Sequence, residues 1–434
     1  MKRFFLITAA LLAATAAHAE PYCADLLNKD ALPKKYAKSA PIYSDAESGW
    51  IFTKDQLKDR YDMKTTSLEL VQAIVDEFAK RDVQLAIMVA PPRPVVVGQE
   101  QLNAAMGDER YDVETARASF DKLIEGLSET GAIVPNLLDV ALADPAIRED
   151  FYFRRDTHWT TLGAAVSAIE LAKLVNARAP DLFPNDGAFG AADLVPSEAI
   201  EEEGSLAKIV NAVCGTSQQA ETATSFDLTR SGGLLGDAQN GSSIALVGSS
   251  FSDRYKRDHY RFGDALARAF DEDIENHSVS GGGPIGAIEA YVLTGVLDRR
   301  EHPLVIWELP YTESFNSSSF LRQLLGALQR GAATQIVAEF NTGKEVVSIN
   351  IENGAELSGI EIVSEDMSNQ GFRLEVHFDK GSKSKISLNR RSAVPASIRD
   401  ASVFSSLNFF GNRNPVEIVI TPEKGAALSA VAVF

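Results

Sequence analysis

A change of hydrophobic period near residue 331 constrains the fold of this chain more than any other feature of its sequence. Residues 41–330 alternate helical patterns with short β-branched runs, which is typical of an α/β fold around a mainly parallel sheet. From about residue 335 onward, apolar residues follow a period of two, in short runs separated by Gly, Asn, Asp and Ser turns. Such a series of short strands predicts a β-sandwich. We therefore expect an α/β domain up to residue 331 and an all-β domain over 335–434.

The same periodicities predict the individual elements. In the α/β part they indicate helices over 67–81, 111–130, 160–177, 262–270, 285–297 and 320–328, and strands over 85–89, 132–134, 244–247 and 304–307. Segment 185–240 is rich in small and polar residues, so we expect long surface connections there. The sandwich strands are expected over 334–340, 346–351, 360–363, 372–378, 384–388, 416–421 and 428–434.

The N-terminal segment has the three parts of a secretory signal peptide. Lys2 and Arg3 precede an apolar run over 4–17, and Ala17-His18-Ala19 matches an A-x-A cleavage site. An uncleaved anchor is the alternative, but the apolar run is short and ends in small residues. We expect residues 1–19 to be removed, so that the α/β domain spans 20–331.

The two cysteines of the chain, Cys23 and Cys214, both lie in the expected mature part. In an oxidising compartment an isolated pair favours a disulfide over a metal site. Two buried free thiols are the alternative. A bridge would attach residues 20–40 to the first domain.

Charge and histidine spacing exclude two classes of function. The formal charge is −18, or −20 once Lys2 and Arg3 are removed, so the chain lacks the basic surface that nucleic-acid binding requires. None of the five mature histidines lies three or four residues from another, and no cysteine pair has zinc-finger spacing, so we expect no metal. These histidines are His158, His259, His277, His302 and His377.

Two segments carry residues suited to acyl transfer. In Asp156-Thr157-His158, residues i and i+2 of an extended segment face the same side, so the Asp156 carboxylate could orient the His158 imidazole. The alternative is a helix N-terminal turn in which Asp156 favours the dipole. Gly248-Ser249-Ser250 directly follows a buried strand, where open α/β sheets place reactive groups, although it is not a G-x-S-x-G elbow. An ordinary turn is the alternative.

A glycine-rich loop over 281–283 lies about 30 residues beyond the serine turn. Its backbone can approach a ligand closely and supply an oxyanion donor. It is not a Walker-type phosphate loop. A flexible turn before the next helix is the alternative reading.

Together with Trp307-Glu308-Leu309-Pro310, these segments resemble the SGNH hydrolase-like domain of the alginate O-acetyltransferase family over roughly residues 40–315. The resemblance implies that Ser250, rather than Ser249, is the nucleophile, with His158 as general base and Asp156 as its orienting carboxylate. It places Gly282 and Trp307 near the oxyanion or substrate. Ser249 replaces the Asp of the Gly-Asp-Ser motif found in ordinary SGNH esterases, and a Gly-x-Asn-Asp block is missing.

The resemblance also implies a function and its partners. It implies a periplasmic enzyme that acetylates an exopolysaccharide through an acetyl-serine, without a cofactor, and receives acetyl groups from a membrane-bound acyltransferase among secretion-complex components. AlgX-like members carry a C-terminal carbohydrate-binding module, which fits residues 335–434. Phe404, Phe409 and Phe410 are expected either to stack on sugar rings or to fill the sandwich core. A carbohydrate acetyl esterase and a non-catalytic scaffold remain the alternative functions.

Overall fold

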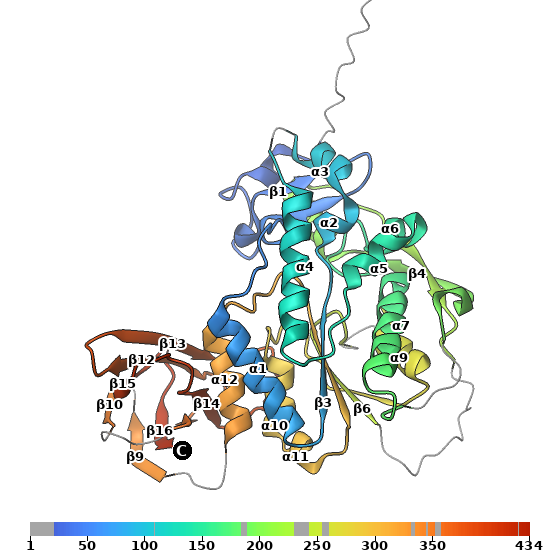
Figure 1. The fold of residues 1–434 in the computed structure, drawn as a ribbon. Coiled ribbons are helices and arrows are strands. Elements are labelled where there is room, and N and C mark those ends of the chain that lie inside the picture. The colour runs from blue at the N-terminus through green and yellow to red at the C-terminus, as the bar shows by residue number, and fades with distance from the viewer. Residues whose placement is uncertain are drawn as a thin grey trace, which may run out of the picture.

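The computed structural model describes residues 21–434 except 108, 184–188, 230–242, 254–259, 331–334, 344–345, 352–356 and 424. The expected signal peptide, His259 and the expected domain boundary at residue 331 lie outside the described residues. Figure 1 shows an α/β part, coloured blue to yellow, beside a red C-terminal part made of strands. The change of hydrophobic period therefore corresponds to a change of architecture.

The α/β part is built on a four-stranded parallel sheet. Its order is β3 (Gln84–Val89), β8 (Leu304–Leu309), β6 (Ile244–Val247) and β7 (Ile274–Asn276). The residues of β6 and β8 are all buried, as expected for strands covered on both faces. The predicted parallel sheet is confirmed.

Helices flank this sheet, with α1 and α12 between it and the C-terminal part and α7 and α9 on the other side (Figure 1). The longer helices are α1 (Thr65–Ala79), α4 (Val113–Glu129), α7 (Thr161–Arg178), α9 (Phe262–Phe270), α10 (Gly286–Leu293) and α12 (Ser318–Gln329). Shorter ones are α2 (Arg93–Val97), α3 (Gln99–Met106), α5 (Leu137–Ala143), α6 (Pro145–Asp150) and α11 (Val296–Arg299). The helix expected over 285–297 thus divides into α10 and α11.

Two expectations for the α/β part were wrong. The strand expected over 132–134 is a single bridge between Ile133 and Ala86. Within 185–240, the structure has a helix, α8 (Ser205–Cys214), and a hairpin of β4 (Pro196–Glu202) with β5 (Glu221–Phe226). Most of β4 is exposed, so its sequence lacks the apolar alternation that would have revealed it.

The N-terminal segment packs on α8 and is bonded to it. Cys23 and Cys214 form a disulfide, as predicted. Leu26 and the short strands β1 (Ile42–Ser44) and β2 (Ile51–Thr53) share a small apolar cluster with Leu206 and Ile209 of α8. Residues 21–53 therefore belong to the α/β part.

The C-terminal part is a sandwich of two four-stranded antiparallel sheets, which confirms the prediction. One sheet has the order β10 (Val347–Asn350), β15 (Pro415–Pro422), β12 (Gly371–Phe378), β13 (Lys383–Asn389). The other has the order β14 (Ser402–Ser406), β11 (Gly359–Ser364), β16 (Leu428–Val433), β9 (Gln335–Gly343). Among the sandwich strands that the structure describes, only β14 was not predicted, because its Ser-Val-Phe-Ser-Ser sequence does not alternate apolar and polar residues.

The sandwich packs tightly against α10 and α12. A Cβ on Gly326 of α12 would lie 2.6 Å from the backbone of Ser405, so the helix backbone directly contacts β14. Glu289 of α10 forms an ion pair with Arg390 at 3.0 Å, and both side chains are at most 3% exposed. Gln323 of α12 donates to the same carboxylate at 2.9 Å. The two parts therefore share a buried polar network as well as apolar contacts.

Candidate active site

The segment with Asp156 and His158 forms a narrow loop before α7. Tyr152 and Trp159 pair as an antiparallel bridge, and the Thr160 side chain accepts from the Gly163 N–H to cap the helix. A Cβ on Gly163 would lie 2.3 Å from the carbonyl oxygen of Phe151, so only glycine allows this close approach. The loop is thus fixed at its base by the start of α7.

The structure brings this loop to the turn that follows β6. The Oγ of Ser250 lies 2.8 Å from the Nε2 of His158, across 92 residues of sequence. The indole N–H of Trp159 donates to the carbonyl of Phe251 at 3.2 Å and fixes the loop to the turn. Ser250 therefore lies at the carboxyl end of a parallel strand, the edge where α/β sheets bind ligands.

Asp156 completes the chain of hydrogen bonds. Its Oδ1 lies 2.5 Å from the Nδ1 of His158 and accepts the His158 backbone N–H at 2.9 Å, and its Oδ2 accepts the Ser205 N–H. Burial raises the pKa of this carboxyl, but the positive charge of His158 and these hydrogen bonds outweigh it and hold the pKa well below its usual range. The Asp156 side chain therefore stays ionised and favours the tautomer with the proton on Nδ1.

One backbone donor is free beside the nucleophile. The N–H groups of Ser249, Phe251, Ser252 and Asp253 are all hydrogen-bonded within the turn or to the neighbouring strand. The Ser250 N–H has no partner among the residues that the structure describes. It is therefore available to an oxyanion formed at Ser250.

The backbone N–H of Gly282 and the indole N–H of Trp307, which we expected near the oxyanion or substrate, both donate to carbonyl groups of the protein. The Gly282 N–H donates to Val279 within its own turn at 3.1 Å. Trp307 is 1% exposed in the sheet, and its indole N–H donates to the Pro284 carbonyl at 3.0 Å. The glycine-rich loop instead accommodates the sandwich, because a Cβ on Gly283 would lie 2.5 Å from the Nε of Arg391.

Two residues at the site had no role in the sequence analysis. The Tyr260 ring stacks on the His158 ring at 4.7 Å between centroids, and its hydroxyl lies 3.0 Å from the Nδ1. Glu308, at the end of β8, accepts hydrogen bonds from Ser249 and Ser252 beneath the nucleophile turn. Glu308 belongs to the quoted Trp307–Pro310 motif, whereas no local pattern marks Tyr260.

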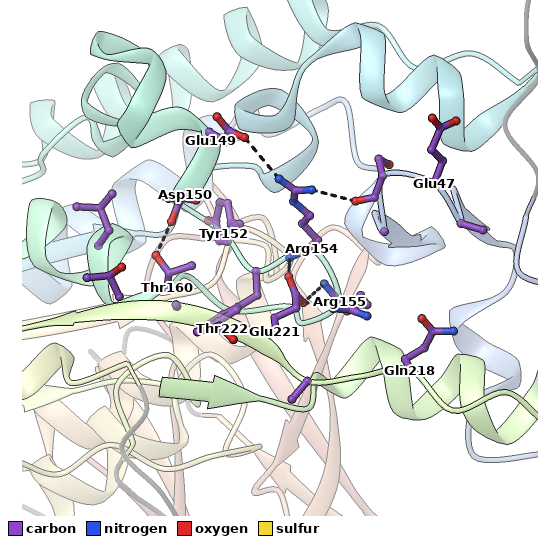
Figure 2. Close-up of a pocket in the computed structure, with 18 of the residues that line it drawn as sticks. Glu47, Glu149, Asp150, Tyr152, Arg154, Arg155, Thr160, Gln218, Glu221 and Thr222 are labelled. Atoms are coloured by element: carbon purple, nitrogen blue, oxygen red, sulfur yellow. Dashed lines mark hydrogen bonds and ion pairs between the residues drawn. The ribbon is translucent and has the colours of Figure 1, made fainter. Parts of the chain in front are cut away.

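A separate cavity of about 600 Å³ lies beside the loop residues that precede Asp156. Figure 2 shows Arg154 and Glu149 pointing toward each other, and Glu221 pointing toward Arg155. Arg154 pairs with Glu149 at 3.5 Å, and Arg155 pairs with Glu221 at 3.6 Å. Two of the four carboxylates that line the cavity are thus paired with its two guanidinium groups, and we assign this cavity no ligand. Among the described residues, no three His, Cys, Asp or Glu side chains are arranged to hold a metal ion.

Comparison with known proteins places the chain in a family. Residues 45–311 match the family model described as "SGNH hydrolase-like domain, acetyltransferase AlgX". The alginate biosynthesis protein AlgX of Pseudomonas putida is 26% identical over 369 residues, which cover 80% of this chain and 71% of that protein. AlgX of Azotobacter vinelandii is 25% identical, covering 92% of this chain and 87% of that protein.

The fold agrees over both parts of the chain. The structure of Pseudomonas aeruginosa AlgX superposes with a TM-score of 0.68 at 18% sequence identity, covering 95% of this chain and 98% of that one. The α/β part and the sandwich therefore share the architecture of AlgX. Because the family model spans more than half of the sequence, the chain belongs to the family of SGNH hydrolase-like acetyltransferase domains represented by AlgX.

Proposed function

We propose that this chain transfers acetyl groups to hydroxyls of an exopolysaccharide, alginate or a similar polymer, through an acetyl-serine on Ser250. Family membership supports acetyl transfer, and the AlgX relatives that match are named for alginate biosynthesis. The observation that carries the proposal is the continuous hydrogen-bond chain from Ser250 through His158 to Asp156. Nucleophile, base and orienting carboxylate are within the reach that covalent catalysis requires.

In the first half-reaction, the Ser250 Oγ bonds to the carbonyl carbon of an acetyl donor and gives its proton to the Nε2 of His158. The Asp156 carboxylate stabilises the imidazolium that results. The Ser250 N–H donates to the tetrahedral oxyanion. When the intermediate collapses, the bond to the leaving group breaks, and that group takes the proton from His158.

The second half-reaction reverses these roles. A sugar hydroxyl gives its proton to His158 as its oxygen bonds to the acetyl carbon. The ester bond to Ser250 then breaks, and His158 returns the proton to the Ser250 Oγ. The products are the acetylated sugar and the free enzyme, so no cofactor is needed.

We propose that the sandwich holds the polymer. Phe404 and Phe410 are 4% and 7% exposed and belong to the packed interior, whereas Phe409 is 36% exposed. The Phe409 ring borders a groove of about 480 Å³ between the start of α1 and the sandwich, also lined by Lys64 and Arg413. These cations would offset the net negative charge of the chain toward an anionic polymer.

The proposed location is the periplasm, with the acetyl donor a membrane-bound acyltransferase of a secretion complex. This follows from the signal peptide predicted over residues 1–19 and from the lack of a soluble acetyl carrier outside the cytoplasm. Within the described part of the chain, no helix is both long enough and apolar enough to cross a membrane.

Substitution of the three residues tests the proposal. Ser250→Ala and His158→Ala should each lower acetyl-ester turnover by a factor of about 10³ or more, and Asp156→Ala should also remove most of it, because they act as one unit. A sulfonyl fluoride should label Ser250 in the wild type. Ser278→Ala, which removes a buried hydroxyl outside the turn, serves as the matched control.

The acceptor is tested with an oligosaccharide and an activated acetyl ester together. Transfer to the sugar in excess of hydrolysis supports the transferase, whereas hydrolysis alone identifies an esterase. A folded chain that is neither labelled nor active would be a scaffold. Labelling and turnover of Ser250→Ala at the wild-type rate would show that Ser250 is not the nucleophile.

A further inference from the structure

The structure contains a buried carboxylate beside the nucleophile that the mechanism above does not use. Glu308 is 1% exposed and follows Trp307, which pairs with Val247 in the parallel register of β6 and β8. This register places Glu308 next to Gly248, where a Cβ would lie only 2.6 Å from its Oε2. The glycine before the serine turn therefore makes room for this carboxylate.

Glu308 fixes the turn on both sides of Ser250. Its Oε2 accepts the backbone N–H of Ser249 at 2.8 Å and the hydroxyl of Ser252 at 2.8 Å. The Ser249 hydroxyl lies 3.0 Å from both carboxylate oxygens, and it accepts the N–H of Phe251 at 3.2 Å. The residues immediately before and after Ser250 are thus tied, directly or through Ser249, to one carboxylate.

We propose that Glu308 is a positioning residue for the nucleophile: it holds the turn so that the Ser250 Oγ points at His158 and the Ser250 N–H stays free for the oxyanion. This inference rests on the proposed function, because it assigns a role relative to Ser250. The proposal also gives a reason for the serine at position 249, where ordinary SGNH esterases have an Asp. In this chain the carboxylate at the turn is that of Glu308 on β8, and the Ser249 hydroxyl can donate to it.

The surroundings of Glu308 are unusual for a carboxylate that only stabilises the fold. Glu289 is equally buried, but it faces the guanidinium of Arg390. Glu308 forms no ion pair among the described residues, and its hydrogen bonds come from hydroxyl and backbone donors. Burial raises its pKa, while the hydrogen bonds from Ser249 and Ser252 act in the opposite direction. An unpaired buried carboxylate costs stability, so its presence at a reactive turn is consistent with a functional role.

The test compares Glu308→Gln, Glu308→Ala and Ser252→Ala in the mature protein. The rate at which phenylmethylsulfonyl fluoride labels Ser250 is measured together with kcat and KM for an activated acetyl ester. Glu308→Ala should lower the labelling rate and kcat by about 10²-fold or more, since small misplacements of a reacting atom have effects of this size. Glu308→Gln keeps the shape of the side chain and one acceptor oxygen, so its labelling rate and kcat should fall less than those of Glu308→Ala. KM should change by less than about threefold, because the ester is not bound by Glu308.

Two further measurements and a fallback keep the inference falsifiable. Glu289→Gln, the matched control, should lower the melting temperature but label at the wild-type rate. The losses from Glu308→Gln and Ser252→Ala should be less than additive in the double variant, because both break the same network. If Glu308→Ala fails to fold, Glu308→Gln and Ser252→Ala decide the question.

Folded Glu308 variants that label as fast as the wild type would overturn the inference while leaving the proposed function intact. Failure to label Ser250 in the wild type would instead overturn the proposed function. The two failures are therefore distinguishable.

Discussion

The buried ion pair between Glu289 and Arg390 should make the α/β part and the sandwich unfold together. The Arg390 guanidinium also donates to Gln370 and to the carbonyls of Asp400 and Ser402. Arg390→Met removes all of these bonds and leaves the Glu289 carboxylate buried without a cation. Breaking a buried pair in this way costs about 3–5 kcal/mol.

This cost can be converted into a melting temperature. Because the entropy of unfolding grows with chain length, the melting temperature of a chain of this size changes by about 1 °C per kcal/mol of stability. The melting temperature of Arg390→Met should therefore be about 3–5 °C below that of the wild type. Arg299→Met is the matched control, since Arg299 and Glu301 form an ion pair at 2.7 Å with both side chains about half exposed. An exposed pair contributes at most about 1 kcal/mol. Arg390→Met combined with Glu289→Leu should recover most of the loss, because no charge then remains buried.

The chain offers two independent probes for the assay. Its three tryptophans, Trp50, Trp159 and Trp307, all lie in the α/β part, so their fluorescence follows that part alone. Circular dichroism follows both parts. The two midpoints should coincide in the wild type and fall together in Arg390→Met. A fluorescence midpoint that does not move, or a shift no larger than that of Arg299→Met, would refute the reasoning.

Three other predictions follow from the site, from the packing of the two parts and from the disulfide. The pKa of Asp156 is lower in the folded than in the unfolded protein, so its ionised form stabilises the fold at any pH above the unfolded pKa of about 3.9. This stability is lost as the pH falls toward the folded pKa. Circular dichroism should therefore show the fold intact at pH 5 and weakening only below about pH 4. A chain ending at Arg330 exposes the face of α12 that packs on β14, so we expect it to lose its cooperative melt; a cooperative melt with full activity on a small ester would show an independent domain. Replacing Cys23 and Cys214 by serine should lower the unfolding free energy by about 2–5 kcal/mol, measured in urea, and an unchanged midpoint would mean that the bridge contributes nothing.

The fold could be predicted wherever burial leaves a periodic trace in the sequence. The strands around Leu246 and Ile306 are apolar throughout because both faces of the sheet are covered. The hairpin of β4 and β5 and the serine-rich β14 show no such periodic pattern. Most of β4 is exposed, and β14 is buried by its contacts with α12 despite its serines.

The candidate site was predictable to the extent that its chemistry is local. Asp156 and His158 are two residues apart, and Ser250 follows a recognisable strand, so short patterns together with the family resemblance were enough to name them as candidates. No sequence pattern shows that the Gly282 N–H donates to Val279 or that Arg391 lies against Gly283, because these contacts depend on the three-dimensional arrangement. The same holds for Tyr260 and Glu308, whose partners lie on other segments.

The bridge between Cys23 and Cys214 also bears on how the chain matures. The two residues are separated by 191 positions, so during synthesis Cys23 emerges long before its partner exists. Because the sequence contains no other cysteine, incorrect pairing within one molecule is impossible. Before Cys214 is made, the Cys23 thiol can form a wrong disulfide only with another molecule. A disulfide isomerase therefore has nothing to correct within this chain, and an oxidant acting after residue 214 has emerged is sufficient.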